Sequence, residues 1–264
     1  MGLIKHSWFQ IFVSGFVLLY LSERALVYTR DLVFLPSVIL LGSFLVPVTF
    51  VAYLYERLPD WDVPLPPLAV CFLWGGVLGT VIAGALEYRT FVTLSFLSLF
   101  GAGLIEEAAK LIFPLIYYFL GRYRSEADGI ILGVCAAMGF AALETMGYAL
   151  VTFLQSRQDL TALDEVLLLR GLTSPAGHAA WTGLVCAVLF REGLRAGSAV
   201  LTWRIMGAFV TAVLLHALWN IFNSLSGSAT VNFLSVVLSI GIALASLTLL
   251  ILRAREAIRA LPAR

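Results

Sequence analysis

Charged residues are scarce in this chain. Only 12% of its 264 residues are Asp, Glu, Lys or Arg, whereas 61% are hydrophobic, and the mean hydropathy is +0.96. A soluble domain is about half apolar and about a quarter charged. The shortage of charge therefore excludes an ordinary soluble domain and indicates a polytopic membrane protein. The net charge of +1 gives no indication of a nucleic-acid partner.

Cysteine is scarce as well. The three cysteines, Cys71, Cys135 and Cys186, lie far apart, each within an apolar run. Because no CxxC or Cys/His spacing occurs, neither a disulfide framework nor a zinc finger is indicated. We expect these residues to be small packing groups.

Long hydrophobic runs fill most of the chain. A spanning helix needs about 20 apolar residues. Eight runs are candidates, although the first is short: 8–22, 32–55, 68–86, 92–121, 128–154, 175–192, 203–222 and 230–252. The fourth run is long, and we expect it to be tilted, or broken near Phe100–Gly103. The sequence therefore predicts an all-α fold, a polytopic transmembrane helix bundle of about eight spans that forms a single integral membrane domain over residues 1–264.

The basic residues predict the orientation of the bundle. With the N-terminus inside, the inner segments hold Lys5, Arg57, Arg122, Arg124, Arg191, Arg195, Arg204, Arg253, Arg255, Arg259 and Arg264. The outer loops hold Arg24, Arg30, Arg89, Arg157 and Arg170. Because basic residues accumulate on the cytoplasmic side, we expect both termini to be cytoplasmic, in agreement with an even number of spans.

Two loops and one helix carry local signals. Segment 58–67 is rich in proline, which stops a helix and stiffens the turn. Segment 155–174 places leucines and charged residues at helical spacing, which predicts a short amphipathic helix on the membrane surface that could act as a lid. Gly129, Gly133 and Ala137 recur every four residues, a spacing that lets helices approach closely in lipid.

Ionisable groups inside the spans are costly and usually mark a functional path. They are Glu106, Glu107, Lys110, Glu144, His178 and His216, with Asn220 one helical turn after His216. At about 1.5 Å per residue, the groups on four helices lie roughly 18–24 Å from the cytoplasmic side. That common depth lies in the outer half of a hydrocarbon core of about 30 Å. We therefore expect Glu106, Glu107, Glu144, His178 and His216 to line one cavity.

Each of these residues also has a purely structural interpretation. Lys110 is spaced to pair with Glu106 or Glu107 along one helix. Glu144 alone could be a protonated packing group. His178 could be a polar anchor at the membrane interface, and His216 could form an interhelical hydrogen bond together with Asn220.

Taken together, the residues suggest hydrolysis. A carboxylate in a low dielectric has a raised basicity and can act as a general base. Neutral imidazole can share a proton, bind a metal or polarise water, and the Asn220 amide can donate hydrogen bonds to a developing oxyanion. Because no serine or cysteine is obviously coupled to a base, we expect activated water, rather than a covalent nucleophile, to attack a carbonyl.

Four motifs resemble those of one family. They are "EEAAK" (106–110), "DGIILGVCAAMGFAALE" (128–144), "GHAAW" (177–181) and "HALWN" (216–220), within a motif-bearing core over residues 90–225. In this order they resemble the PrsW family of bacterial intramembrane proteases, distant relatives of the CAAX prenyl endopeptidases. Thr145 is a departure, since the family often has Asn after the glutamate of the second motif.

The resemblance implies roles for the polar residues. Glu106 and Glu107 would form the catalytic pair, with Glu106 as the base that activates water and His178 beside it. His216 and Asn220 would hold the oxyanion, and Glu144 would take part in a less defined role. The family is classed with metalloproteases, and two histidines with a carboxylate suffice for catalytic zinc. The candidate ligands are Glu144, His178 and His216, and a metal-free glutamate mechanism is the alternative.

The resemblance also implies a partner and a location. The substrate would be a membrane-anchored protein, similar to an anti-sigma factor, and the enzyme would be a multi-pass protein of the cell membrane. The depth of the polar residues, in the outer half of the bilayer, separately predicts a cut near the extracytoplasmic end of the substrate's span. Two other function classes stay open at this point. Buried Glu and His also build the proton relays of transporters, and a non-catalytic scaffold could bind single-span proteins.

Overall fold

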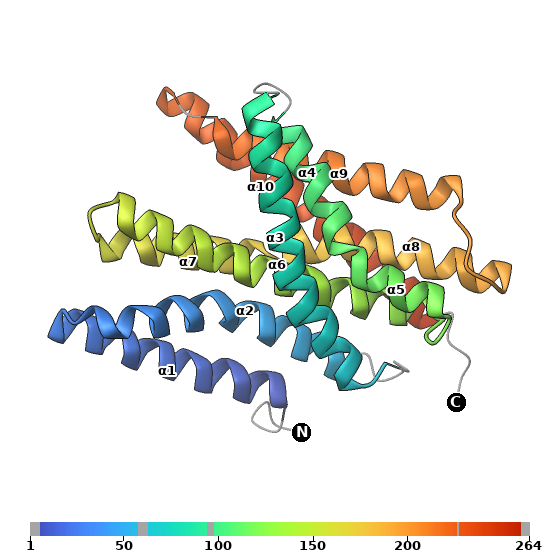
Figure 1. Cartoon of the computed structure of the whole chain (residues 1–264), viewed down its shortest axis with the longest axis horizontal. Coiled ribbons are helices and arrows are strands. Elements are labelled where there is room, and N and C mark those ends of the chain that lie inside the picture. Colours follow the sequence, from blue (N-terminus) through green and yellow to red (C-terminus); the bar gives the residue numbers. More distant parts are fainter. Residues whose placement is uncertain (1–5, 58–62, 94–97, 226, 260–264) are drawn as a thin grey trace. The chain divides into compact units, whose positions relative to one another are not determined.

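The computed structural model describes residues 6–57, 63–93, 98–225 and 227–259, and the regular elements in these ranges are all helices (Figure 1). In chain order they are α1 (Ser7–Thr29), the 3-10 turn η2 (Leu32–Phe34), α2 (Leu35–Arg57), α3 (Leu65–Thr93), α4 (Ser98–Lys110), α5 (Ile112–Leu120), α6 (Glu126–Gln155), α7 (Leu160–Thr173), the π-helix η3 (Pro175–Ala179), α8 (Ala180–Ala196), α9 (Trp203–Ser224) and α10 (Ala229–Arg259). The predicted all-α fold is confirmed. The first half of the proline-rich segment 58–67 lies outside the described residues, as do Lys5 and Arg264 of the orientation argument.

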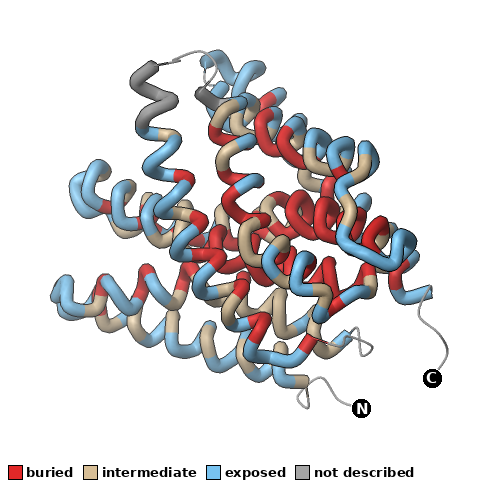
Figure 2. The backbone as a smooth tube through the Cα atoms, turned by 45° about the vertical axis from the view of Figure 1, so that its right-hand side comes forward, coloured by how far each residue is buried: buried red, intermediate tan, exposed pale blue. Residues whose placement is uncertain are grey.

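Within the described residues, six helical segments are long and apolar enough to cross a membrane. They are Ser7–Thr29, Leu32–Arg57, Leu65–Tyr88, Glu126–Gln155, Trp203–Ser224 and Ala229–Arg259. Large apolar side chains such as Phe16, Val81 and Leu244 are exposed along three of them, which fits surfaces that face lipid (Figure 2). The fourth and sixth of the eight predicted spans have a different form.

The fourth predicted span, of which residues 94–97 lie outside the described residues, is broken at Leu111, between α4 and α5, whereas Phe100–Gly103 itself lies inside α4. Pro114 gives the physical reason, because it has no N–H to donate to the carbonyl of Lys110 and its ring crowds that carbonyl. The ladder therefore tightens locally, with the Leu111 N–H donating to the Ala108 carbonyl at 3.3 Å.

The sixth predicted span begins with a turn of π-helix. Residues Pro175–Ala179 form this wide turn, and α8 continues from it for 17 residues. Single π turns within helices are often found at functional sites, because the wider turn re-aims the side chains that it carries. Here the turn carries His178.

The described residues divide into two compact units. Unit 1 comprises residues 6–57 and 141–175, that is α1, η2, α2, the second half of α6 and α7. Its core is a cluster of Leu26, Leu35, Val38, Ile39, Ala149, Phe153, Leu163 and Leu167.

Helix α7 confirms the predicted helix in segment 155–174, but its surroundings differ from the prediction. It begins at Asp159, whose carboxylate accepts from the Thr161 N–H at 2.9 Å. One face packs on α2, where a Cβ added to Gly42 would lie 2.8 Å from a methyl carbon of Leu167. Leu168 and Leu169 are exposed on the other side, so α7 is apolar on two faces instead of one. Its role as a lid stays a prediction.

Unit 2 comprises the described residues of 60–140 and 176–264, and its centre is formed by the first half of α6 against α8. A Cβ added to Gly133 would lie 2.7 Å from the Cys186 sulfur, and one added to Gly139 would lie 1.9 Å from the Phe72 carbonyl oxygen. The close approach predicted from the small residues is therefore confirmed. Cys71, Cys135 and Cys186 are buried free thiols, as expected of packing residues.

Candidate active site

Helix α4 presents two adjacent glutamates to helix α9. The two helices lie close together at Gly103, where an added Cβ would be 3.2 Å from the Val213 carbonyl oxygen and 3.3 Å from the Ala217 nitrogen. Only a residue without a side chain allows this approach with no shift of a neighbour. The approach brings Glu106 and Glu107, one turn further along α4, next to His216 on α9.

Glu107 is fully buried and is held from three helices. Its Oε1 accepts from Lys110 Nζ at 2.8 Å and from His216 Nδ1 at 2.9 Å. Its Oε2 accepts from Thr182 Oγ1 at 2.9 Å. Because a buried carboxylate is stable only when it is paired and hydrogen-bonded, these contacts fix both oxygens and make Glu107 an orienting group.

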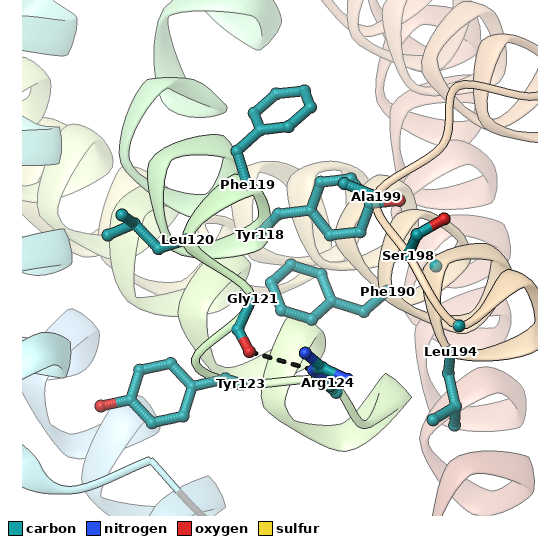
Figure 3. A pocket seen from close by; sticks show the side chains of 12 residues that line it. Tyr118, Phe119, Leu120, Gly121, Tyr123, Arg124, Phe190, Leu194, Ser198 and Ala199 are labelled. Atoms are coloured by element: carbon teal, nitrogen blue, oxygen red, sulfur yellow. Dashed lines mark hydrogen bonds between the residues drawn. The ribbon is translucent and has the colours of Figure 1, made fainter.

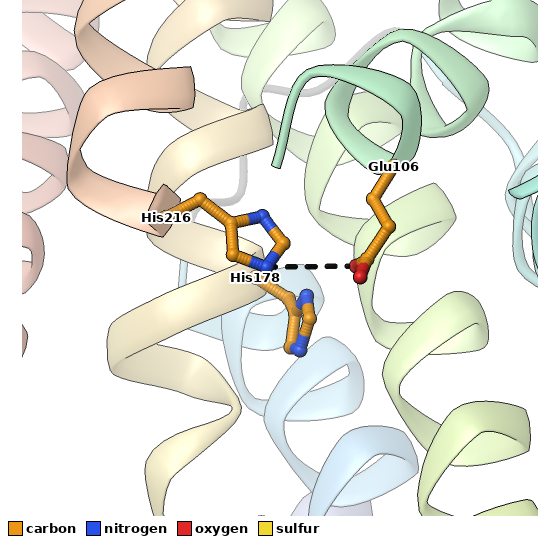
Figure 4. A group of neighbouring side chains, drawn as sticks. All are labelled: Glu106, His178 and His216. Carbon is orange, nitrogen blue, oxygen red and sulfur yellow. Dashed lines mark ion pairs between the residues drawn. The ribbon is translucent and has the colours of Figure 1, made fainter. Parts of the chain in front are cut away.

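The contact with Glu107 sets the orientation of the His216 ring. A carboxylate only accepts, so Nδ1 of His216 donates to Glu107 and Nε2 is turned toward Glu106. Nε2 lies 3.6 Å from Glu106 Oε2 (Figure 4). The Trp181 indole stacks on the His216 ring with centroids 4.5 Å apart and planes at 24°, and its N–H donates to Ser246 Oγ at 2.9 Å. The His216 ring is therefore held at its edge by Glu107 and on one face by the Trp181 indole.

His178 reaches the same cluster from the π-helix. Its Nδ1 lies 2.8 Å from Lys110 Nζ, and its ring stands at 88° to that of His216 with centroids 5.5 Å apart. Lys110 is fully buried and also lies 3.3 Å from Glu106 Oε2. The buried cluster, as we call it, thus contains Glu106, Glu107, Lys110, His178, Thr182 and His216.

Glu144 and Asn220, two further predicted site residues, are placed differently. Glu144 belongs to unit 1, where it pairs with Arg170 Nη2 at 2.6 Å. Arg170 also donates to Thr145 Oγ1 at 3.2 Å and lies 4.3 Å above the Tyr148 ring. Asn220 is half-buried on α9, one turn beyond His216. The catalytic roles of Glu144 and Asn220 stay predictions.

Three residues that support the cluster are not among the site residues predicted from the sequence. Thr182 holds Glu107, Trp181 stacks on His216, and Ser246 holds Trp181. Trp181 and Thr182 follow His178 by three and four residues, the spacing at which helical side chains share a face. That spacing was a usable signal for the first two, whereas Ser246 lies among apolar residues of α10 with no comparable signal.

One group of donors within the cluster fits a metal ion. Glu106, His178 and His216 each offer one ligand atom, and these atoms lie within 4.8 Å of one another (Figure 4). A carboxylate with two imidazoles is a ligand set of catalytic zinc. Glu107 supplies the carboxylate that commonly orients a ligating histidine from behind. The ligands predicted from the sequence were Glu144, His178 and His216. The group seen in the structure shares both histidines, but its carboxylate is that of Glu106 and not that of Glu144.

A cavity of about 300 Å³ lies at the other end of α8 (Figure 3). Tyr118, Phe190, Arg124 and Ser198 are among its lining residues. The Tyr118 hydroxyl closes one side, donating to the Val200 carbonyl at 2.9 Å and accepting from the Val200 N–H at 2.8 Å. Phe190, the first lining residue on α8, follows His178 by 12 residues, which is about 18 Å along a helix. The cavity is therefore not part of the buried cluster.

A comparison with known families gives the cluster its context. Residues 63–247, more than two thirds of the chain, match the family described as PrsW family intramembrane metalloprotease. The match spans every residue of the buried cluster and confirms the resemblance seen in the four motifs. No curated protein and no solved structure matches the chain. The family favours an enzyme over the transporter and the scaffold, and the chain belongs to the PrsW family of intramembrane metalloproteases.

Proposed function

We propose that this chain cleaves a membrane-anchored protein by attack of water on a peptide carbonyl, with Glu106 as the general base. The choice of Glu106 rests on the contacts of Glu107, whose two carboxylate oxygens are both hydrogen-bonded, to Lys110, Thr182 and His216. A carboxylate so fixed is poorly placed to take a proton from water. Glu106 lies within 4.8 Å of a nitrogen of each histidine, and 6% of its surface is exposed whereas that of Glu107 is 0%, so Glu106 is the carboxylate that a substrate and a water molecule could reach.

The histidines take complementary roles. An ammonium only donates hydrogen bonds, so His178 accepts from Lys110 at Nδ1 and its neutral ring carries the proton on Nε2. That N–H can donate to the developing oxyanion, with Asn220 as a second donor as the sequence predicts. His216 has the opposite tautomer, and its Nε2 can receive the proton from Glu106 and pass it to the leaving amine.

A metal ion is compatible with the same residues. Glu106, His178 and His216 would hold it, with Glu107 orienting His216. When bound, zinc would polarise the carbonyl and lower the pKa of the attacking water. Glu144, which belongs to unit 1, stays a predicted participant.

The predicted topology indicates the side of the membrane on which the substrate would be cleaved. With both termini cytoplasmic, the residues of the cluster lie in the outer half of the bilayer, and water reaches them by the shorter route from outside. The substrate would be a single-span protein cut near the extracytoplasmic end of its span, which sheds an outer domain and leaves a membrane-bound stump. An anti-sigma factor is such a protein, by resemblance to the family, and the cell membrane is the corresponding location.

Co-expression with tagged single-span proteins tests the proposal. Wild type should yield truncated products, whereas Glu106→Gln should bind the substrate and lose turnover. Glu192→Gln, which changes a carboxylate at the far end of α8, is the matched control and should cleave normally. Mass spectrometry of the new termini locates the cut. Full activity of Glu106→Gln would refute the role of Glu106, and termini on the cytoplasmic side would refute the topology.

A further inference from the structure

Lys110 is the most completely buried charged side chain of the cluster, and the proposed chemistry gives it no step of its own. Its side chain has 0% exposure, and its ammonium lies 4.4 Å above the centroid of the Phe140 ring. Removing an ammonium from water is costly unless good partners replace the lost hydration. Its partners include Glu106, Glu107 and His178.

These partners overlap with the candidate metal ligands. Lys110 Nζ is 3.3 Å from Glu106 Oε2 and 2.8 Å from His178 Nδ1, and both residues belong to the group of three that fits a metal. The third member, His216, is held by Glu107 and not by Lys110. One ammonium thus contacts two of the three candidate ligands.

This contact acts against metal binding in two ways. It leaves the ring proton of neutral His178 on Nε2, and a protonated nitrogen cannot ligate a metal. It also keeps a positive charge within a few ångströms of the place where a divalent cation would be held, where the local dielectric is low and repulsion is strong. Glu106, by contrast, is attracted to either cation.

We propose that the Lys110 ammonium and a divalent cation are alternative occupants of one acidic pocket, so that Lys110 weakens metal binding and must withdraw when a metal enters. The proposal rests on the ligand set of the proposed function. It assigns Lys110 as a positioning residue that presents His178 as a hydrogen-bond donor while the ammonium is in place.

Zinc titration of the purified full chain in detergent tests the proposal. Lys110→Met removes the charge and keeps much of the length of the side chain, and we expect it to bind zinc at least tenfold more tightly than wild type in competition with a chromophoric chelator. Arg253→Met is the matched control, because Arg253 forms a part-buried pair with Glu126 elsewhere in unit 2. Its zinc affinity should stay within twofold of wild type. Equal or weaker zinc binding by Lys110→Met would overturn the proposal.

A second measurement uses wild type and does not depend on how the variant folds. The sequence contains only two lysines, Lys5 and Lys110, so selective ¹⁵Nζ-lysine labelling gives one signal for the site and one as reference. One equivalent of zinc should shift the Lys110 signal as the ammonium leaves Glu106 and His178. Zinc binding with an unchanged Lys110 signal, or no zinc binding by wild type or Lys110→Met, would refute the proposal. Proteolysis assayed in parallel reports separately on the proposed function.

Discussion

Helix α8 has a network of charged groups at each end, and the two networks differ in how far their cations reach water. At its start, the side chains of Glu106, Glu107 and Lys110 are between 0% and 8% exposed. Near its end, the Glu192 side chain is also only 5% exposed, but it is bonded to Arg195 at 3.2 Å and to Arg204 at 3.3 Å, and those arginines are 59% and 68% exposed. Both networks join carboxylates to cations at similar distances.

The comparison shows that distance alone does not distinguish a buried site from a network whose cations reach water. Ion pairs with exposed members contribute about 0–1 kcal/mol, because water and salt screen them. Removing one member of a fully buried pair costs about 3–5 kcal/mol, because the remaining charge is left without a partner. The arginines around Glu192 keep water as an alternative partner, whereas Lys110 in the buried cluster has none, a cost that the proposed catalysis would account for.

Removal of the central carboxylate should have the largest effect. In Glu107→Ala, Lys110 and His216 lose a partner, and we expect a loss of about 3–5 kcal/mol in the free energy of unfolding together with loss of cleavage. Glu192→Ala should lose about 1 kcal/mol or less, because Arg195 and Arg204 are exposed and keep their contact with water when the carboxylate is removed. Unfolding in detergent, followed by circular dichroism, compares the two. Equal destabilisation would remove the contrast between the two ends of α8.

The histidines test catalysis with less effect on stability. His178→Ala and His216→Ala should each reduce cleavage by about 10²-fold to 10⁴-fold, the range for loss of a general acid or base, while the protein remains folded. Asn220→Ala should be milder, since a donor to the oxyanion contributes about 10²-fold to 10³-fold and shares this task with His178. Initial rates on a cleavable single-span substrate measure all three. Full activity of either histidine variant would exclude its proposed role.

The close approach of α4 and α9 predicts a smaller effect. Gly103→Val places a branched side chain where a Cβ already lies 3.2 Å from a carbonyl oxygen, and overpacking of this kind costs about 1–3 kcal/mol. The helices should separate, and the contact between Glu107 and His216 should lengthen. Gly207→Val on α9 is the control, since no atom lies within 4 Å of its added Cβ. Similar thermal stability and activity of the two variants would show that the approach at Gly103 is not needed.

Some of these features could be predicted from the sequence and others could not. The spans follow from hydrophobic length, and Glu106, Glu107, His178 and His216 stand out because ionisable groups are rare in apolar runs. The break at Leu111 also had a signal, namely Pro114 three residues later. The exact pairing within the cluster could not be read, because it depends on how α4, α8 and α9 rotate about their axes. Thr182 and Ser246 show this most clearly, since hydroxyl residues are common in membrane helices and only packing selects these two.

Loss of a single supporting hydrogen bond should have the smallest effect. Ser246 on α10 accepts from the Trp181 indole, and Trp181 in turn stacks on His216. Ser246→Ala leaves a buried indole N–H without its partner, and a neutral hydrogen bond of this kind contributes about 0.5–1.5 kcal/mol. Trp181→Phe removes the same N–H but keeps an aromatic ring against His216, so the two single variants should resemble each other. Combined, they should cost little more than either alone, because each removes the same bond. Additive losses in cleavage rate would mean that Trp181 supports His216 by its size and not through α10.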